Sequence, residues 1–303
     1  MTDLAIFYEH PTWFEPLFAA LERRGIAATR LTPAGLAYDP ADPTPPARMI
    51  VNRISMSSGS RATDTPIFFT ASLLDHWSQH ARVVNGRPFL LDASKARQLS
   101  LLSSLGIDAP ATRIVHRPQD VAAAAEAIGF PLIVKANIGG AGAGIVRYDD
   151  MGALQDAVAD GTLPTSSDGV LLVQDLVSAR DGRVIRIETL GGRFLYALSV
   201  LSDGGFDLCP ADACVATPGR AAVRMEAITP PDALIEAAER IVQAAGIEVG
   251  GVEVMIDDRD GTPRFYDINA LSNFVAKPLD VLGWDPHDRF VDYLSQVMAE
   301  ARA

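Results

Sequence analysis

The segment FPLIVKANIGGAGAGIV, residues 130–146, decides the fold because it joins two predicted strands through a glycine-rich loop. Residues 131–136 predict a strand that carries Lys135, and residues 145–148 predict the strand that follows the loop. The loop lacks both the GK[ST] ending of a Walker loop and the G-x-G-x-x-G pattern of dinucleotide-binding proteins. Such a hairpin is either a plain flexible turn or a flap whose backbone N–H groups close over phosphates, with Lys135 adding a positive charge. Four glycines within six residues favour the flap: Gly139, Gly140, Gly142 and Gly144.

A second constellation lies in GGVEVMIDDRDGTPRFYDINALSNF, residues 250–274. The pattern predicts two strands joined by the turn sequence DDRDGTP, residues 249–256 and 264–268. Because side chains alternate along a strand, Asp267 and Asn269 share one face, and pairing across the turn can bring Glu253 to that face. Two carboxylates and an amide oxygen suit a hard cation. The alternative is a buried carboxylate paired with an arginine.

The rest of the chain mixes strands and helices in a β-α-β opening followed by hairpins, which indicates a combined α/β and α+β class. The further predicted strands are residues 4–8, 26–31, 48–55, 112–115, 170–176, 184–190 and 194–201. The predicted helices are residues 13–24, 65–79, 94–105, 118–128, 231–245 and 288–301. Gly191 and Gly192 indicate a tight hairpin between the last two of those strands.

Composition excludes several classes of protein. The net charge of −12 repels nucleic acid. No run reaches the roughly 18 apolar residues that a membrane-spanning helix needs, and no leader opens the sequence, so we expect a cytoplasmic protein. Cys209 and Cys214 are too few for a disulfide framework, and without a nearby histidine they favour a structural or pocket-shaping role over zinc binding.

A glycine hairpin preceded by a lysine, and a later β-hairpin ending in D-x-N, resemble the ATP-grasp superfamily, and most closely its RimK-type ribosomal-protein glutamate ligases and other carboxylate–amine ligases. The resemblance extends over nearly the whole chain. It implies a small N-terminal α/β domain, residues 1–92, before an ATP-grasp domain, residues 93–303. That domain holds ATP between two α+β lobes, about residues 108–175 and 176–303.

The resemblance also implies roles for individual residues. Lys95, Lys135 and the four glycines would bind the ATP phosphates. The segment LLVQDLV would be the inter-lobe hinge that meets adenine, through Gln174, Asp175, Leu176 and Val177. Metal ions that bridge the phosphates would be held by Glu253, Asp267 and Asn269. Arg186 matches the arginine of a D-I-R motif and would act catalytically together with Lys135.

The sequence departs from the family pattern at three places. Val184 replaces the aspartate of D-I-R, which leaves Asp181 as the alternative ribose contact. The usual E-x-N reads Asp267-x-Asn269, in which the acidic side chain is shorter. The segment GGFDLCPADAC differs from the family's acyl-substrate region, so the substrate stays open. Its candidate contacts are Arg53, Arg61, Ser272 and Asn273, each equally open to a plain surface or turn role.

The implied activity is ATP-dependent carboxylate–amine ligation through an acyl phosphate, with release of ADP and phosphate. The expected cofactors are ATP and Mg²⁺, two ions by resemblance, with Mn²⁺ as an alternative. The substrates would be small carboxylates and amines, or a peptide or protein. The alternatives are a modifier of proteins or ribosomal peptides, by glutamylation or macrolactam formation, and a phosphotransferase. A homo-oligomer is expected only as the common default.

Overall fold

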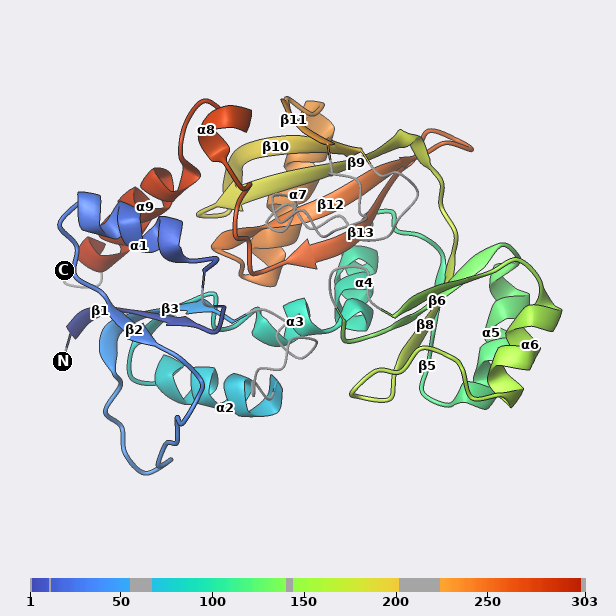
Figure 1. Cartoon of the computed structure of the whole chain (residues 1–303), viewed down its shortest axis with the longest axis horizontal. Coiled ribbons are helices and arrows are strands. Elements are labelled where there is room, and N and C mark those ends of the chain that lie inside the picture. Colours follow the sequence, from blue (N-terminus) through green and yellow to red (C-terminus); the bar gives the residue numbers. More distant parts are fainter. Residues whose placement is uncertain (1, 11, 55–66, 140–143, 202–223, 301–303) are drawn as a thin grey trace.

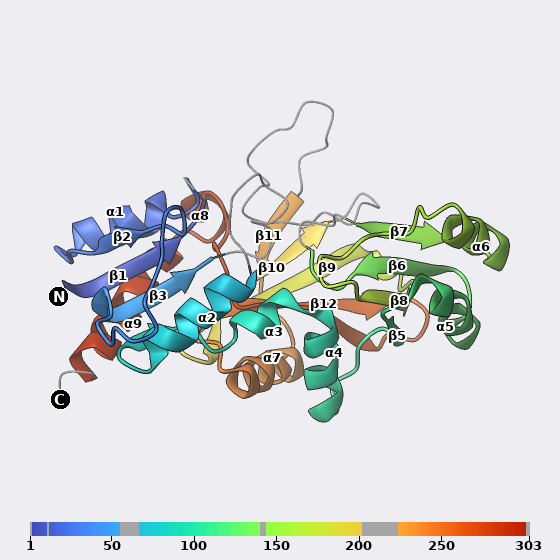
Figure 2. The same ribbon diagram turned by 90° about the horizontal axis from the view of Figure 1, so that it is seen from below.

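Three β-sheets organise the computed structural model of this chain, which describes residues 2–10, 12–54, 67–139, 144–201 and 224–300. Figure 1 shows the sheet of the N-terminal residues at the left, the sheet of the C-terminal half in the middle and the third sheet at the right. Figure 2 shows the same succession after a 90° turn, so the sheets follow one another along the longest axis. The predicted mixture of α/β and α+β architecture is confirmed.

The N-terminal sheet is parallel throughout. Its strands, in spatial order, are β2 (Thr29–Leu31), β1 (Thr2–Tyr8), β3 (Ala47–Arg53) and β4 (Arg82–Val84). The helices of this part are α1 (Glu15–Arg23), α2 (Ile67–Ser78) and α3 (Phe89–Ala93). Parallel strands end at one edge of a sheet, and this edge is where open α/β sheets present ligands. Arg53, the last residue of β3, therefore lies at the edge that such proteins use for binding.

The third sheet is antiparallel and carries the glycine hairpin. Its strands, in spatial order, are β5 (Thr112–Val115), β8 (Leu171–Asp175), β6 (Leu132–Ala136) and β7 (Ile145–Tyr148). The short 3-10 helix η2 (Pro118–Asp120), α5 (Val121–Ile128) and α6 (Met151–Ala159) complete this unit. Both α-helices lie on one face of the sheet (Figure 2), where their apolar residues form a separate core with β6 and β8. On the opposite face, Ile133, Lys135 and Leu172 are buried as well.

The middle sheet is the largest and supplies the polar face discussed below. Its strands, in spatial order, are β11 (Arg224–Ile228), β10 (Arg193–Leu201), β9 (Ala179–Leu190), β12 (Val249–Asp257) and β13 (Pro263–Asn269). The helices α4 (Lys95–Ser104) and α7 (Asp232–Ala245) pack on its apolar face. The predicted hairpins β9–β10 and β12–β13 are both present.

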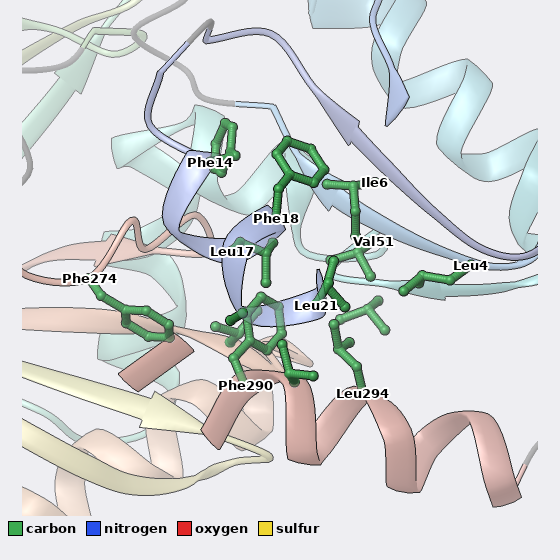
Figure 3. Close-up of a cluster of buried hydrophobic side chains, with 14 of the residues drawn as sticks. Leu4, Ile6, Phe14, Leu17, Phe18, Leu21, Val51, Phe274, Phe290 and Leu294 are labelled. Carbon is green, nitrogen blue, oxygen red and sulfur yellow. The ribbon is translucent and has the colours of Figure 1, made fainter. Parts of the chain in front are cut away.

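The last helices, α8 (Pro278–Val281) and α9 (Pro286–Glu300), return the chain to the N-terminal unit. Phe290 and Leu294 of α9 lie fully buried against Leu17 and Leu21 of α1 (Figure 3). The same cluster includes Leu198 of β10. One apolar core therefore joins the N-terminal sheet to the middle sheet. The domain boundaries proposed from the sequence stay a prediction.

Some element bounds differ from those predicted. Strand β9 begins at Ala179 rather than at residue 184, because its early residues still pair with the end of β12. Helix α9 begins at Pro286, where Asp285 accepts a hydrogen bond from the His287 N–H. Helix α6 was not predicted, although Asp150 caps it by accepting from the Ala153 N–H at 2.9 Å. No described helix is long and apolar enough to cross a membrane.

Candidate functional site

Two rows of side chains cross the middle sheet on one face. In the first row, Arg186 of β9 stands opposite Glu253 of β12, which stands opposite Asp267 of β13. The sequence prediction that Glu253 and Asp267 share a face is thus confirmed. The next row places Glu188, Gly251 and Asn269 in the same order. The sheet therefore gathers charged and amide groups from three strands in one place.

The opposite face of the same strands is apolar, which explains why the polar residues lie together on one face. Ile187, Val252 and Ile268 alternate with the polar residues and are buried in the core that α4 and α7 cover. Burying those apolar residues fixes the register, because a slip of one residue would turn the charged row into the core. The polar face is therefore held by packing on the other side of the sheet.

Glu253 is the most enclosed carboxylate of the first row, with 8% of its surface exposed. Its Oε1 accepts from Arg186 Nη1 at 2.9 Å, and its Oε2 accepts from the Tyr266 hydroxyl at 2.8 Å. Burial, together with the charge of Asp267, raises the pKa of Glu253. A cation placed against it would lower that pKa again.

Lys95 reaches this carboxylate pair from the first residue of α4. Its Nζ donates to Oδ1 of Asp267. Burial opposes ionisation of Asp267, but the Lys95 charge and hydrogen bond bring the pKa of Asp267 below its usual value. The start of α4 is fixed by Asn137, whose backbone and side-chain oxygens accept from the Lys95 N–H and Ala96 N–H. Asn137 follows β6 and so ties α4 to the third sheet.

Lys135 approaches from β6 and is 8% exposed. Burial, and then the charge of Lys95, lower the pKa of Lys135 to about 8, whereas Asp267 opposes this shift. The chain contains three lysines, and two of them act electrostatically on one carboxylate. A positive charge that is buried beside another is costly, so this arrangement indicates a site for an anion.

The glycine loop is described only at its ends. Gly139 follows β6 and is partly buried, and Gly144 precedes β7 with a φ of +72°, which favours glycine. The Gly144 carbonyl accepts from the Ala136 N–H at 3.3 Å, so the strands pair up to the loop. Gly140 and Gly142 lie outside the described residues.

The residues of the expected hinge already make hydrogen bonds within the protein. Gln174 donates to the Thr112 hydroxyl at 2.7 Å, and the Leu176 N–H donates to the Pro131 carbonyl at 3.4 Å. Asp175 accepts from Arg259 at 2.6 and 3.2 Å. Each Asp175 oxygen thus accepts one hydrogen bond and keeps a second acceptor position. The adenine-binding role of Asp175 and of its neighbour Val177 stays a prediction.

Asp181 is exposed within β9 and has a φ of +57°. No contact of its side chain with the two rows is seen, and its proposed ribose contact also stays a prediction. Arg61, one of the candidate substrate residues, lies outside the described residues, as do Cys209 and Cys214.

The other candidate substrate residues meet at the edge of the N-terminal sheet. Arg53 is 2% exposed, and its Nη2 donates to the Ser272 carbonyl. The Ser272 hydroxyl accepts from the Phe274 N–H at 3.1 Å, which shapes the segment that follows β13. Oδ1 of Asn273 is buried without a hydrogen-bond partner. The structure therefore places Arg53 against Ser272, which precedes Asn273 in the chain.

Glu253, Asp267 and Asn269 fit a magnesium site in their chemistry. They offer carboxylate and amide oxygens, which this ion prefers, and their small number leaves positions for phosphate oxygens. Among the described residues, no group of three or more His, Cys, Asp or Glu side chains gathers as a complete metal cage. Lys95 and Arg186 now neutralise the two carboxylates, so an ion would have to displace or share these contacts.

Besides Asn137, sequence reasoning missed Glu188, Tyr266 and Asp92. Glu188 is 1% exposed and accepts from Arg186 Nε at 2.6 Å; its position two residues after Arg186 on a strand was a usable signal. Tyr266 and Asp92 gave no such signal. Asp92 accepts from the Ala270 N–H at 2.7 Å, and burial raises the pKa of Asp92 to about 7.

Comparison with known proteins assigns the family. Residues 92–276, more than half of the chain, match the RimK-like ATP-grasp domain. A probable alpha-L-glutamate ligase of Citrobacter koseri is 30% identical over 178 residues, which cover 58% of this chain and 55% of that protein. A D-alanine–D-alanine ligase of Xanthomonas axonopodis is 32% identical over 124 residues, which cover 40% and 36%. The chain thus spans about half the length, or less, of these curated relatives.

Solved structures agree over almost the full chain. The ATP-grasp ligase PsnB in complex with a minimal precursor superimposes with a TM-score of 0.71 at 17% identity, covering 98% of this chain and 100% of PsnB. A RimK-domain ATP-grasp protein of Sphaerobacter thermophilus gives 0.68 at 21% identity, covering 95% and 98%. These likenesses establish the ATP-grasp fold. The chain belongs to the RimK-like ATP-grasp family.

Proposed function

We propose that this chain is an ATP-dependent ligase that joins a carboxylate to an amine through an acyl phosphate. One observation carries the proposal. Lys95 and Lys135, from two different elements, converge on the carboxylate pair formed by Glu253 and Asp267. Buried lysines beside paired carboxylates can hold phosphate oxygens and the ions that accompany them.

These residues would have distinct roles in the two steps of the reaction. A substrate carboxylate attacks the γ-phosphorus of ATP, the bond to ADP breaks, and an acyl phosphate forms. The amine nitrogen then attacks the acyl carbon, and inorganic phosphate leaves with the bonding electrons. Lys95, Lys135 and Arg186 orient the phosphates and offset their charge, and the loop between Gly139 and Gly144 shields the acyl phosphate from water.

Mg²⁺, when bound, would neutralise charge on the transferred phosphate, and Glu253, Asp267 and Asn269 would hold it. Two ions are proposed from the family resemblance, with Mn²⁺ as an alternative. Because Lys95 now contacts Asp267, we expect its ammonium to turn from that carboxylate to the phosphates when ATP and metal enter. Arg186 would remain next to Glu188.

Modification of a peptide or protein is the second candidate. Two similar proteins support it: a ribosomal protein bS6–L-glutamate ligase of Shigella boydii, and PsnB, whose solved complex holds a precursor. A cytoplasmic location and a homo-oligomeric state are also proposals.

A phosphotransferase is a third alternative, and it would need only one acceptor and no amine.

The test is ADP and phosphate release from Mg-ATP with pooled carboxylates and amines. We expect release that requires both pools and is lost in Lys135→Ala. Lys277→Ala is the matched control, because Lys277 is exposed at the start of α8 and should leave the rate unchanged. Release with the carboxylate pool alone, together with a stable phosphorylated product, would favour a phosphotransferase. Release that appears only with a peptide would favour the second candidate.

A further inference from the structure

Strand β13 carries two of the three proposed metal ligands, Asp267 and Asn269, at an edge of the middle sheet. β12 pairs with one side of β13, and within the described residues no strand pairs with its other side. On such an edge, every second residue points its backbone N–H and C=O groups away from the sheet. Ile268, between the two ligands, is 1% exposed, so its backbone groups need partners within the protein.

The side chain of Gln98, on α4, supplies both partners of Ile268. Its Oε1 accepts from the Ile268 N–H at 3.0 Å, and its Nε2 donates to the Ile268 carbonyl at 2.9 Å. One side-chain amide thus bonds Ile268 as a residue of a neighbouring strand would. Gln98 is itself 1% exposed, and its Nε2 also donates to the carbonyls of Asp92 and Leu91, at 3.1 and 3.3 Å. These contacts hold the amide in one orientation.

Neighbouring groups on the free edge of β13 are bonded from the same part of the chain. The Ala270 N–H donates to the carboxylate of Asp92, on α3, at 2.7 Å. The Phe265 N–H donates to the carbonyl of Asp108, beyond the end of α4, at 2.9 Å. Figure 1 shows α4 beside β13, with α3 next to it. The segment from α3 to Asp108 therefore takes the place of a further strand along this edge.

The pairing of β13 with β12 is irregular just before the proposed ligands. Glu253 of β12 pairs with Asp267. The next residue of β12, Val254, pairs with Phe265, which leaves Tyr266 as an extra residue in β13. Such a bulge interrupts the ladder and redirects the side chains beside it. Because β13 ends two residues after Asp267, the part that carries both ligands has little ladder of its own to fix its direction.

We propose that Gln98 is a positioning residue of the metal site. By fixing Ile268 on the free edge, it sets the direction of the Asp267 carboxylate and the Asn269 amide on either side, and it touches neither ion nor nucleotide itself. Lys95 lies one turn earlier on the same helix and contacts Asp267, so α4 brings both a charge and a positioning group to this carboxylate. The inference rests on the proposed function, which places the metal ion at these ligands.

Binding of Mn²⁺ in the presence of ADP tests this role without turnover. Free Mn²⁺ is counted from its electron paramagnetic resonance signal, and the Kd for ADP is measured separately with EDTA present. Gln98→Met is similar in size but bonds neither group of Ile268, so the Kd for Mn²⁺ should rise about tenfold or more. Gln98→Asn keeps an amide on a shorter chain that cannot make both bonds, and it should raise this Kd at least about threefold. Both variants should leave the Kd for metal-free ADP unchanged.

Two control variants separate positioning from a general loss of stability. Leu102→Ala removes a fully buried side chain one turn after Gln98 on α4, so it loosens the helix without touching β13's hydrogen bonds. Gln243→Met removes a similar bond from a helical glutamine, which donates to the Gly192 carbonyl at 3.0 Å in the turn between β9 and β10. Both should bind Mn²⁺ as wild type does, although Leu102→Ala should melt at a lower temperature.

The outcomes distinguish this inference from the function on which it rests. If Gln98→Met binds Mn²⁺ as tightly as wild type, or no more weakly than Leu102→Ala, the positioning role is wrong and the ligase proposal stands. An equal loss of affinity for metal-free ADP would also overturn the role, because it indicates a general disturbance of the nucleotide site. If Gln98→Met does not fold, Gln98→Asn decides by the same criteria. If wild type with ADP binds no Mn²⁺, the proposed metal site and this inference fail together.

Discussion

The charge on Lys135 should make ATP binding depend on pH. Burial and the neighbouring Lys95 lower the pKa of Lys135 to about 8, so its ammonium is fully present below pH 7 and is lost as the pH rises through 8. We expect the Kd for Mg-ATP to be constant between about pH 6 and 7. Above pH 8 it should rise by up to about tenfold per unit, because binding must then take up a proton.

Isothermal titration in buffers of different ionisation enthalpy measures both the affinity and the proton uptake. Lys135→Arg is the control, since an arginine stays protonated throughout this range. If Lys135→Arg shows the same loss of affinity above pH 8, another group is responsible and the assignment fails.

Single residues were predictable wherever local pattern decided their position. Alternation, with pairing across the turn, placed Glu253 and Asp267 on one face, and a run of apolar residues placed Lys135 on a strand. The contact of Arg53 with Ser272 joins residues 219 positions apart, so no local pattern could reveal it. Asn137 was missed for the same reason, because its role is to fix α4 against another sheet.

Strand β12 approaches a neighbouring segment closely at Gly250, on the face opposite to Glu253. A Cβ on Gly250 would lie 2.3 Å from the Asn269 carbonyl oxygen and 2.7 Å from Cγ2 of Ile247. We expect Gly250→Ala to lower the free energy of unfolding by about 1–3 kcal/mol, because backbone must shift to admit the methyl group. Urea unfolding measures the change.

Gly152→Ala is the matched control for this substitution. Gly152 lies in the first turn of α6, where a Cβ would meet only Oδ1 of Asp150 at 3.3 Å. Alanine should be neutral there or stabilise by up to about 1 kcal/mol, since it favours helix. Equal effects at Gly250 and Gly152 would show that the close approach to Asn269 does not matter.

Elements were predicted best where both periodicity and turn chemistry were strong. β5 and β7 match their predicted residues, and the DDRDGTP turn gave the β12–β13 hairpin. Helix α6 was missed because it is short and buries only Leu154 and Ala157, and its stability depends on packing against α5 and the third sheet. The helical state of this segment is therefore set by tertiary contacts, which its local sequence does not reveal.

The order of the three sheets follows from the family resemblance, but the way they are joined does not. The core around Phe290 and Leu294 contains residues from both ends of the chain and from the middle sheet (Figure 3). A division after residue 92 cuts through contacts made by this core. Its composition depends on segments more than 200 positions apart, which no local reading of the sequence can join.

This shared core predicts that the N-terminal and middle sheets lose stability together. Leu294 is fully buried in α9, so Leu294→Ala should lower the free energy of unfolding by about 2–5 kcal/mol. Hydrogen exchange should then speed up in α9, α1, β1 and β10 alike, because all four contribute to the same cluster.

Leu154→Ala is the matched control, since Leu154 of α6 is equally buried but belongs to the core of the third sheet. It should speed exchange in β6 and β8 and leave α1 and β1 unchanged. If Leu294→Ala speeds exchange in α9 alone, the packing of this helix does not stabilise the N-terminal unit, and the prediction is wrong.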